Sequence, residues 1–213
     1  MRTRPLVSSL MVSLFLLWGA RAQAQPVEPK GAGFALGFRT AYGVPVGRSV
    51  ADARVADEFG QTLSQQVEVA YYFNPRLSLG AYFQLGFGRS PDACFEALCG
   101  ATVVRYGLEL DYRFRPGEFV SPWVGVGIGY EFATSQLVSD DGEDLAGSMQ
   151  RRGFDLGHAN VGLDLRLNRT VVLGPYLTTS LGRYRKTDAR HIPGDSRRFH
   201  VWLQPGVRMQ LHF

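Results

Sequence analysis

The residues that could carry out chemistry are few and scattered along the chain. The four histidines are His158, His191, His200 and His212, and no two of them have the spacing of a metal-binding motif. Ser180 has no base that the sequence identifies as its partner. The glycine-rich run at 125–129 lies within an alternating segment rather than at the start of a helix, so it does not predict a phosphate site. We therefore expect no catalytic residue, no metal ion and no cofactor.

Composition excludes several classes of protein. Hydrophobic residues make up 45% of the chain, charged residues 20%, and the mean hydropathy is -0.08, which fits neither a disordered chain nor a helical membrane bundle. The first 24 residues hold three arginines and no acid, so 20 basic residues face 19 acidic ones in the remainder. A nearly neutral chain lacks the positive surface that nucleic-acid binding needs.

The first 24 residues have the features of a secretory signal peptide. Two arginines precede an apolar core from Leu6 to Trp18, and Ala22-Gln23-Ala24 supplies a small-x-small cleavage pattern. The apolar core is shorter than the roughly 20 residues of a spanning helix, which argues against an uncleaved membrane anchor. We predict a signal peptide over residues 1–24 and one mature domain over residues 25–213.

The two cysteines, Cys94 and Cys99, lie close together in a polar stretch. No nearby histidine or further cysteine completes a zinc site. An exported chain meets an oxidising compartment, where such a pair forms a disulfide. We expect a loop disulfide between Cys94 and Cys99 that adds only local stability, because the loop it encloses is small.

Eight segments of the mature chain alternate between apolar and polar residues with a period of two, which indicates strands with one apolar and one polar side. They span about 33–44, 63–73, 77–88, 102–114, 123–133, 153–167, 171–184 and 199–213. In the sixth, Phe154 and Leu156 are out of phase, which predicts a bulge near Gly157 and His158 or a strand that continues above the apolar layer. Pro175 is the weak point of the seventh, because proline donates no ladder hydrogen bond.

The links between these segments alternate in length. The long links span about 45–62, 89–101, 134–152 and 185–197, and the shorter ones span 74–76, 115–122 and 168–170. Long and short links therefore gather at opposite ends of the strands, as in an outer-membrane barrel with short periplasmic turns and long external loops. Asn74 and Asn168 begin two of the short links, and asparagine at such a position favours a turn. We predict an all-β fold, an eight-stranded antiparallel up-and-down transmembrane β-barrel.

The free-energy cost of placing a charged side chain against lipid indicates which side of the strands faces the membrane. The apolar phase carries essentially no charged residue, and a charge facing lipid near the midplane costs about 2–4 kcal/mol. The polar phase is rich in glycine, which suits the tightly filled interior of an eight-stranded barrel. Both features favour a polar lumen over the apolar interior of a soluble barrel.

Aromatic residues gather near the segment ends, as in the two girdles of a bilayer-spanning protein. Those assigned to the short-turn rim are Phe73, Tyr112, Phe114, Trp123 and Phe213. Those assigned to the long-loop rim are Tyr42, Phe87, Tyr130, Phe132, Tyr184 and Phe199. The alternative interpretation is the ordinary enrichment of aromatic residues in strands.

The whole mature chain resembles the OmpA/OmpX-like outer-membrane β-barrel proteins of Gram-negative bacteria. The resemblance rests on the signal peptide, the eight amphipathic strands and a terminal Phe213 with Leu211 and Met209 at alternate positions. It implies a location in the outer membrane and insertion by the outer-membrane assembly machinery, which reads such an ending. We expect a monomer in contact with outer-membrane lipids and lipopolysaccharide. The sequence does not identify a surface ligand of the long loops.

The lumen phase holds charged residues of both signs in equal number. They are Arg39, Glu68, Arg105, Glu109, Asp111, Arg113, Glu131, Asp164, Arg166 and Arg208. Because unpaired buried charges are costly, and arginine and carboxylate can pair through forked hydrogen bonds, we expect an ion-pair network that fills the barrel.

The expected role is structural or surface-interacting, because side chains can fill the lumen of an eight-stranded barrel. One alternative is a narrow pore whose charges are solvated. The other is a lipid-modifying enzyme, although the sequence His158-Ala159-Asn160 lacks the His-x-Ser arrangement of barrel deacylases.

The chain end gives a test of the assembly signal. Deleting Phe213 removes the terminal aromatic residue that the resemblance assigns to recognition by the assembly machinery. We expect the variant to accumulate in the periplasm, as measured by cell fractionation and immunoblotting. Normal outer-membrane levels of the variant would remove the main support for the resemblance.

Overall fold

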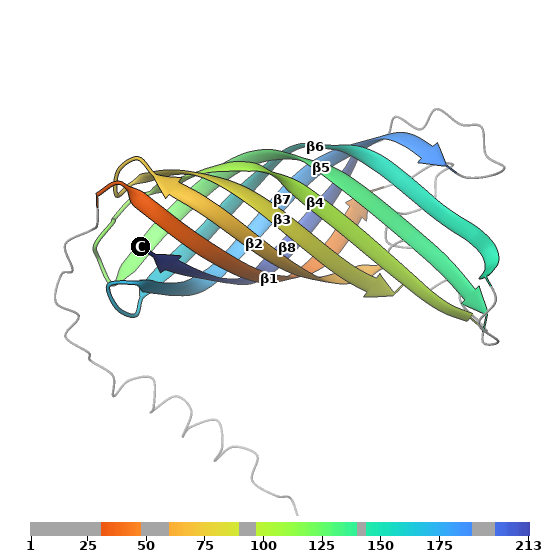
Figure 1. The fold of residues 1–213 in the computed structure, drawn as a ribbon, viewed down its shortest axis with the longest axis horizontal. Helices are drawn as coiled ribbons and strands as arrows, with labels where there is room; N and C mark the ends of the chain where they lie inside the picture. The colour runs from red at the N-terminus through yellow and green to blue at the C-terminus, as the bar shows by residue number, and fades with distance from the viewer. Residues whose placement is uncertain (1–30, 48–59, 90–96, 140–143, 189–198) are drawn as a thin grey trace, which may run out of the picture.

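The computed structural model describes residues 31–47, 60–89, 97–139, 144–188 and 199–213, which form one closed barrel. Its strands are β1 (Gly33–Gly47), β2 (Gln61–Tyr72), β3 (Leu77–Arg89), β4 (Ala97–Arg113), β5 (Val120–Ser139), β6 (Asp144–Arg166), β7 (Val171–Asp188) and β8 (Phe199–His212). Each strand pairs antiparallel with the next, and β1 also pairs with β8, so the sheet has no free edge (Figure 1). The predicted fold class is confirmed.

Within these ranges no helix has the length and hydropathy needed to cross a membrane. The predicted signal peptide, residues 1–24, lies outside the described residues. Cys94 also lies outside them, and Cys99 is placed only by its backbone in β4, so the disulfide stays a prediction.

Three short turns and both ends of the strand array lie at one end of the barrel, which we call the short-turn end (Figure 1). Asn74 Oδ1 accepts hydrogen bonds from the backbone N–H groups of Arg76 and Leu77, at 2.8 and 3.0 Å. Asn168 Oδ1 accepts the equivalent pair of bonds, each 2.8 Å long, from the residues two and three places further on. Side-chain bonds of this kind close Asx turns, which confirms the turn chemistry predicted for both links.

The strands extend further at the opposite end, the long-loop end, than the alternation predicts. β5 continues to Ser139 and β6 begins at Asp144, so most of the predicted link at 134–152 is paired strand. β4 likewise begins at Ala97, inside the predicted link at 89–101. Beyond the lipid and the packed lumen, strands can stay paired through their backbones without side chains of alternating polarity. The predicted bounds of these two links are therefore wrong.

The phase switch in β6 is a β-bulge, as predicted. The pairing of β6 shifts register against both β5 and β7 between Asp155 and His158. The extra residue turns both of these polar side chains inward, while Phe154 and Leu156 face outward with 41% and 47% of their surface exposed.

Pro175 faces outward in β7 at a break in the sheet. Pairing between β6 and β7 is interrupted between Tyr176 and Leu173, whereas pairing between β7 and β8 continues through the proline. Proline can occupy this place because it lacks a ladder donor on the interrupted side. The predicted weak point is confirmed as a local gap.

The polar phase faces the interior and the apolar phase faces outward. β2 alternates between exposed and buried residues over its whole length. On β5, Val126 and Ile128 are 60% and 62% exposed, whereas Trp123 is 1% exposed. An apolar exterior around a polar interior is the arrangement of a transmembrane barrel.

Trp123 corrects the predicted girdle at the short-turn end. It occupies the inward phase of β5, next to the outward Val124, so its ring fills the lumen instead of facing lipid. The other members of that girdle have exposed side chains: Phe73, Tyr112, Phe114 and Phe213. At the long-loop end, the side chain of Tyr184 lies outside the described part of the structure.

Gly107 allows β4 and β5 to approach closely, which gives a test of the packing. A Cβ at Gly107 would collide with the backbone of Ile128 and Gly129, whereas a Cβ at Gly100 on the same strand would meet nothing. We expect Gly107→Ala to lower the free energy of unfolding by roughly 1–3 kcal/mol, because backbone atoms must move. The matched control Gly100→Ala should stay within about 0.5 kcal/mol. Equal urea-unfolding curves for the two variants in detergent micelles would contradict the close approach.

Candidate functional site: the polar lumen

Arg39 joins strands from opposite walls of the barrel. Its guanidinium, on β1, lies 2.5 Å from Glu68 Oε2 on β2 and also binds Glu109 on β4. Asp111, on the same β4, lies 3.8 Å away. All four side chains are buried. Because β1 and β4 are not neighbours in the sheet, the Arg39–Glu109 pair crosses the interior.

Arg208 makes a second set of contacts across the lumen. From β8, its Nη1 donates to Asp111 Oδ2 on β4 at 2.7 Å, and its Nη2 donates to both oxygens of Asp164 on β6 at 3.0 Å. Its guanidinium lies 3.4 Å from the centre of the Trp123 ring, in cation–π contact. Arg113 Nε donates to the same Asp164, also at 3.0 Å. β4, β6 and β8 are thereby linked inside the barrel.

A further group of polar residues lies closer to the long-loop end. Arg105 Nε donates to Glu131 Oε2 at 2.6 Å, and its Nη1 donates to Gln84 Oε1 at 3.1 Å. The Arg105 guanidinium also lies 4.8 Å from the centre of the Trp202 ring. His200 Nε2 is 3.2 Å from Glu131 Oε1. Aromatic rings and ion pairs therefore fill this level of the lumen together.

The structure brings nine of the ten residues assigned to the lumenal network into ion pairs. Arg166 is the exception within the described part of the chain. It is the last residue of β6, at the short-turn end, and its Nε is buried without a hydrogen-bond partner. Asp164, two residues earlier, is already bound by Arg113 and Arg208.

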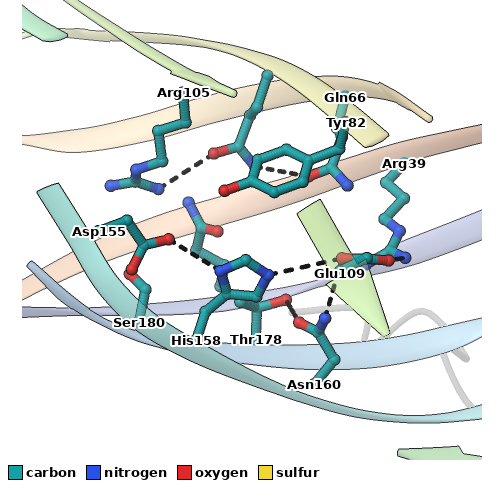
Figure 2. Close-up of a pocket in the computed structure, with 12 residues that line it drawn as sticks. Arg39, Gln66, Tyr82, Arg105, Glu109, Asp155, His158, Asn160, Thr178 and Ser180 are labelled. Carbon is teal, nitrogen blue, oxygen red and sulfur yellow. Dashed lines mark hydrogen bonds and ion pairs between the residues drawn. The ribbon is translucent and has the colours of Figure 1, made fainter. Parts of the chain in front are cut away.

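The sequence analysis missed Asp155 and His158 as members of this network. His158 Nδ1 lies 2.8 Å from Asp155 Oδ2, and its Nε2 lies 3.6 Å from Glu109 Oε2. Figure 2 shows the imidazole ring held between these two carboxylates. The phase switch in β6 was the available signal, because a bulge at this point turns both residues inward.

Ser180 lies opposite His158 in the pairing of β6 with β7, so the residue types of an acyl-transfer triad occur together. The contacts do not connect them as a triad. His158 binds Asp155 through Nδ1 and turns Nε2 towards Glu109, and within the described contacts no hydrogen bond joins Ser180 to the ring (Figure 2). A nucleophile needs its base within hydrogen-bond reach, so this arrangement does not activate Ser180.

Three carboxylates, Glu68, Glu109 and Asp111, place oxygens within 4.8 Å of one another, which is a spacing suited to a metal ion. The Arg39 guanidinium already lies against all three. The guanidinium already supplies a positive charge between these carboxylates, so they do not need a metal ion to balance them. The site therefore does not favour a metal ion.

Free space at the centre of the lumen is small. A cavity of about 10 Å³ lies between Arg39, Glu109, His158 and Ser180 (Figure 2). That volume holds roughly one water molecule. Side chains, rather than solvent, therefore fill most of this level of the barrel.

Removing one charge from the Arg39 group tests its contribution to stability. We expect Glu109→Gln to lower the free energy of unfolding by about 1.5–3 kcal/mol, because the Arg39 guanidinium loses one charged partner but keeps Glu68. A double-mutant cycle with Arg39→Gln, measured by urea unfolding, should show non-additive effects.

The matched control is Ser121→Ala, at a buried lumenal side chain whose Oγ has no hydrogen-bond partner among the described residues. Its effect should stay within about 0.5 kcal/mol. If Glu109→Gln and Ser121→Ala cost the same, the lumenal charges are solvated and the pairs do not stabilise the barrel.

Comparison with protein-family models and with curated protein sequences finds no match. Among solved structures, the chain is similar to Neisserial surface protein A, with 13% identity, a TM-score of 0.56, and coverage of 86% of this chain and 100% of that one. It is also similar to outer membrane protein AlkL in lipid bilayers, with 13% identity, a TM-score of 0.50, and coverage of 88% and 92%. At these identities the likeness shows the fold.

The shared fold confirms the resemblance to the OmpA/OmpX-like barrels at the level of architecture. The apolar exterior of the closed sheet supplies the surface that a bilayer requires. This chain has the fold of an eight-stranded transmembrane β-barrel, which it shares with Neisserial surface protein A and outer membrane protein AlkL.

Proposed function

We propose that this barrel has a structural or surface-binding role, with a lumen that a network of ion pairs largely fills and that does not form an open channel. The Arg39–Glu109 pair carries the proposal, because it joins β1 to β4 through the interior. The contacts of Arg208 with Asp111 and Asp164 add a second crossing.

The energetics of buried pairs support a closed lumen. A solute that passed along the axis would have to separate Arg39 or Arg208 from its carboxylates, and breaking one buried pair costs about 3–5 kcal/mol. Several pairs share their partners, so they would break together: Asp111 contacts both arginines, and Asp164 contacts Arg208 and Arg113.

A narrow pore for ions or small solutes is the second candidate. Polar and charged side chains line the lumen at every level described above, and such side chains could bind passing ions. If the carboxylate and guanidinium groups exchange partners through water, ions could pass without a permanent opening. The pore predicts a steady ion conductance, whereas the closed lumen predicts none that is large and steady.

A catalytic role has less support. The one described grouping of serine, histidine and acid, Ser180 with His158 and Asp155, lies inside the lumen, and His158 is bound to two carboxylates. We propose that Asp155 and His158 instead stabilise the interior and extend the network of Glu109.

The remaining features of the biogenesis are also proposals. Residues 1–24 would be removed on export, and the assembly machinery would read Met209, Leu211 and Phe213. The mature barrel would be a monomer that contacts outer-membrane lipids and lipopolysaccharide through its apolar exterior. A surface ligand, if there is one, would bind at the long-loop end.

Single-channel recording in planar bilayers tests the proposed function. We expect the wild-type barrel to give no large, steady conductance. The double variant Arg39→Ala/Glu109→Ala removes the first crossing together with both of its charges, and it should show measurable ion flux if the pairs block the lumen.

The conductance control is Arg115→Ala/Glu118→Ala, which removes an exposed pair 3.5 Å apart in the turn between β4 and β5. This variant should behave like the wild type. A large steady conductance of the wild-type barrel, unchanged in the lumenal variant, would support the pore and defeat the closed lumen.

A further inference from the structure

The short-turn end of the lumen holds buried nitrogen atoms that lack a hydrogen-bond partner among the described residues. Arg166 makes no ion pair there, and its Nε is buried without a hydrogen-bond partner. His212 Nε2 is likewise buried and without a partner. Both side chains line one niche, together with Arg113 and Arg169. Several nitrogen atoms therefore line this niche, and among the described residues neither Arg166 Nε nor His212 Nε2 has a hydrogen-bond partner there.

The acids near this niche are already engaged. Asp164 accepts hydrogen bonds from Arg113 and Arg208. Glu118, in the turn between β4 and β5, lies 3.5 Å from Arg115. Neither carboxylate is free for Arg166. The terminal carboxylate of Phe213 lines the same niche but makes no ion pair with Arg166 among the described contacts, so the guanidinium can accept a further partner.

Tyr72, in the wall of the niche, holds the Arg113 and His212 side chains in place. The Arg113 guanidinium lies 4.6 Å from the centre of the Tyr72 ring, and the His212 ring lies 5.0 Å from the same centre. Tyr72 itself donates a hydrogen bond to Gln210 at 3.1 Å. A ligand would meet groups that are already oriented, which lowers the entropy cost of binding.

The niche suits the oxygens of a small anionic group. Its inner space is about 20 Å³, enough for one or two oxygen atoms. Phe34 and Phe213 also line it and are 58% and 66% exposed, so the niche borders the lipid-facing surface. Exposed aromatic side chains at a barrel rim lie at the level of lipid headgroups, where phosphate groups are found.

We propose that this niche binds a phosphate group, with Arg166 as the main donor and Arg113, Arg169 and His212 as its surroundings. The planar guanidinium can donate two parallel hydrogen bonds to phosphate oxygens, and its buried Nε–H supplies one of them. The phosphate comes either from a phospholipid headgroup of the adjacent leaflet or from a soluble phosphate. The site is independent of whether the lumen conducts.

The test follows the Arg166 Nε–H signal by NMR of the refolded barrel. In a zwitterionic detergent that has no phosphate group, such as an amine oxide, inorganic phosphate at constant ionic strength should shift this signal saturably. Arg166→Gln should weaken phosphate binding, followed through the His212 ring signals, by about tenfold or more, because a charge-assisted bond is lost. The control Arg115→Gln changes an exposed arginine in the turn between β4 and β5 and should leave the affinity unchanged.

A second arm distinguishes the two sources of phosphate. Micelles of a detergent that has no phosphate group are compared with nanodiscs of phosphatidylcholine and phosphatidylglycerol, all in phosphate-free buffer. A shift of the Arg166 signal in the phospholipid nanodiscs, relative to the detergent, assigns the site to a lipid headgroup, and a response only to inorganic phosphate assigns it to a soluble ligand. No saturable shift in either arm, or equal binding by wild type and Arg166→Gln, would overturn the proposal.

Discussion

The interior of an eight-stranded barrel is just wide enough for side chains to fill, and a charge buried there is costly unless it meets an opposite charge or a hydrogen-bond partner. This constraint explains the main features of the lumen. Arg39 and Arg208 reach carboxylates on strands that are not their neighbours, and Trp123 fills the space beside Arg208. Desolvation makes each buried charge costly, so we expect the pairs to stabilise the barrel mainly because separating them would leave an isolated charge. The exterior, in contrast, needs only apolar surface.

Much of the fold could be predicted from the sequence, because a strand between lipid and a packed lumen must alternate. The eight strands, their order and the inward direction of Glu109 and Arg105 follow from the period of two. The bulge in β6 could be predicted for the same reason, since Phe154 and Leu156 reverse the phase. Alternation fails beyond the membrane, where β5 and β6 continue as a paired ribbon that no pattern of polarity marks.

The partners inside the lumen could not be predicted, because the period of two gives the face of a residue but not its register across the barrel. The sequence placed Arg166 with the other lumenal charges, yet it lies at the rim, and Asp164 is bound by Arg113 and Arg208. Trp123 was assigned to the girdle because it lies near a strand end, whereas its phase directs it inward. The phase of Trp123 could have been read from the alternation, because Val124 beside it belongs to the outward phase. Distance from the rim and cross-strand register are three-dimensional properties, so the place of Arg166 and the pairing of the lumenal charges needed the structure.

Hydrogen exchange of arginine side chains tests most directly whether side chains, rather than water, fill the lumen. The Nε–H protons of Arg39 and Arg208 lie in the buried network, whereas that of Arg115 lies in an exposed turn. After transfer of the refolded barrel into deuterated buffer, NMR should show the Arg39 and Arg208 signals persisting long after the Arg115 signal has disappeared. Loss of all three signals at the same rate would mean that water reaches the network freely, and would contradict a lumen filled by ion pairs.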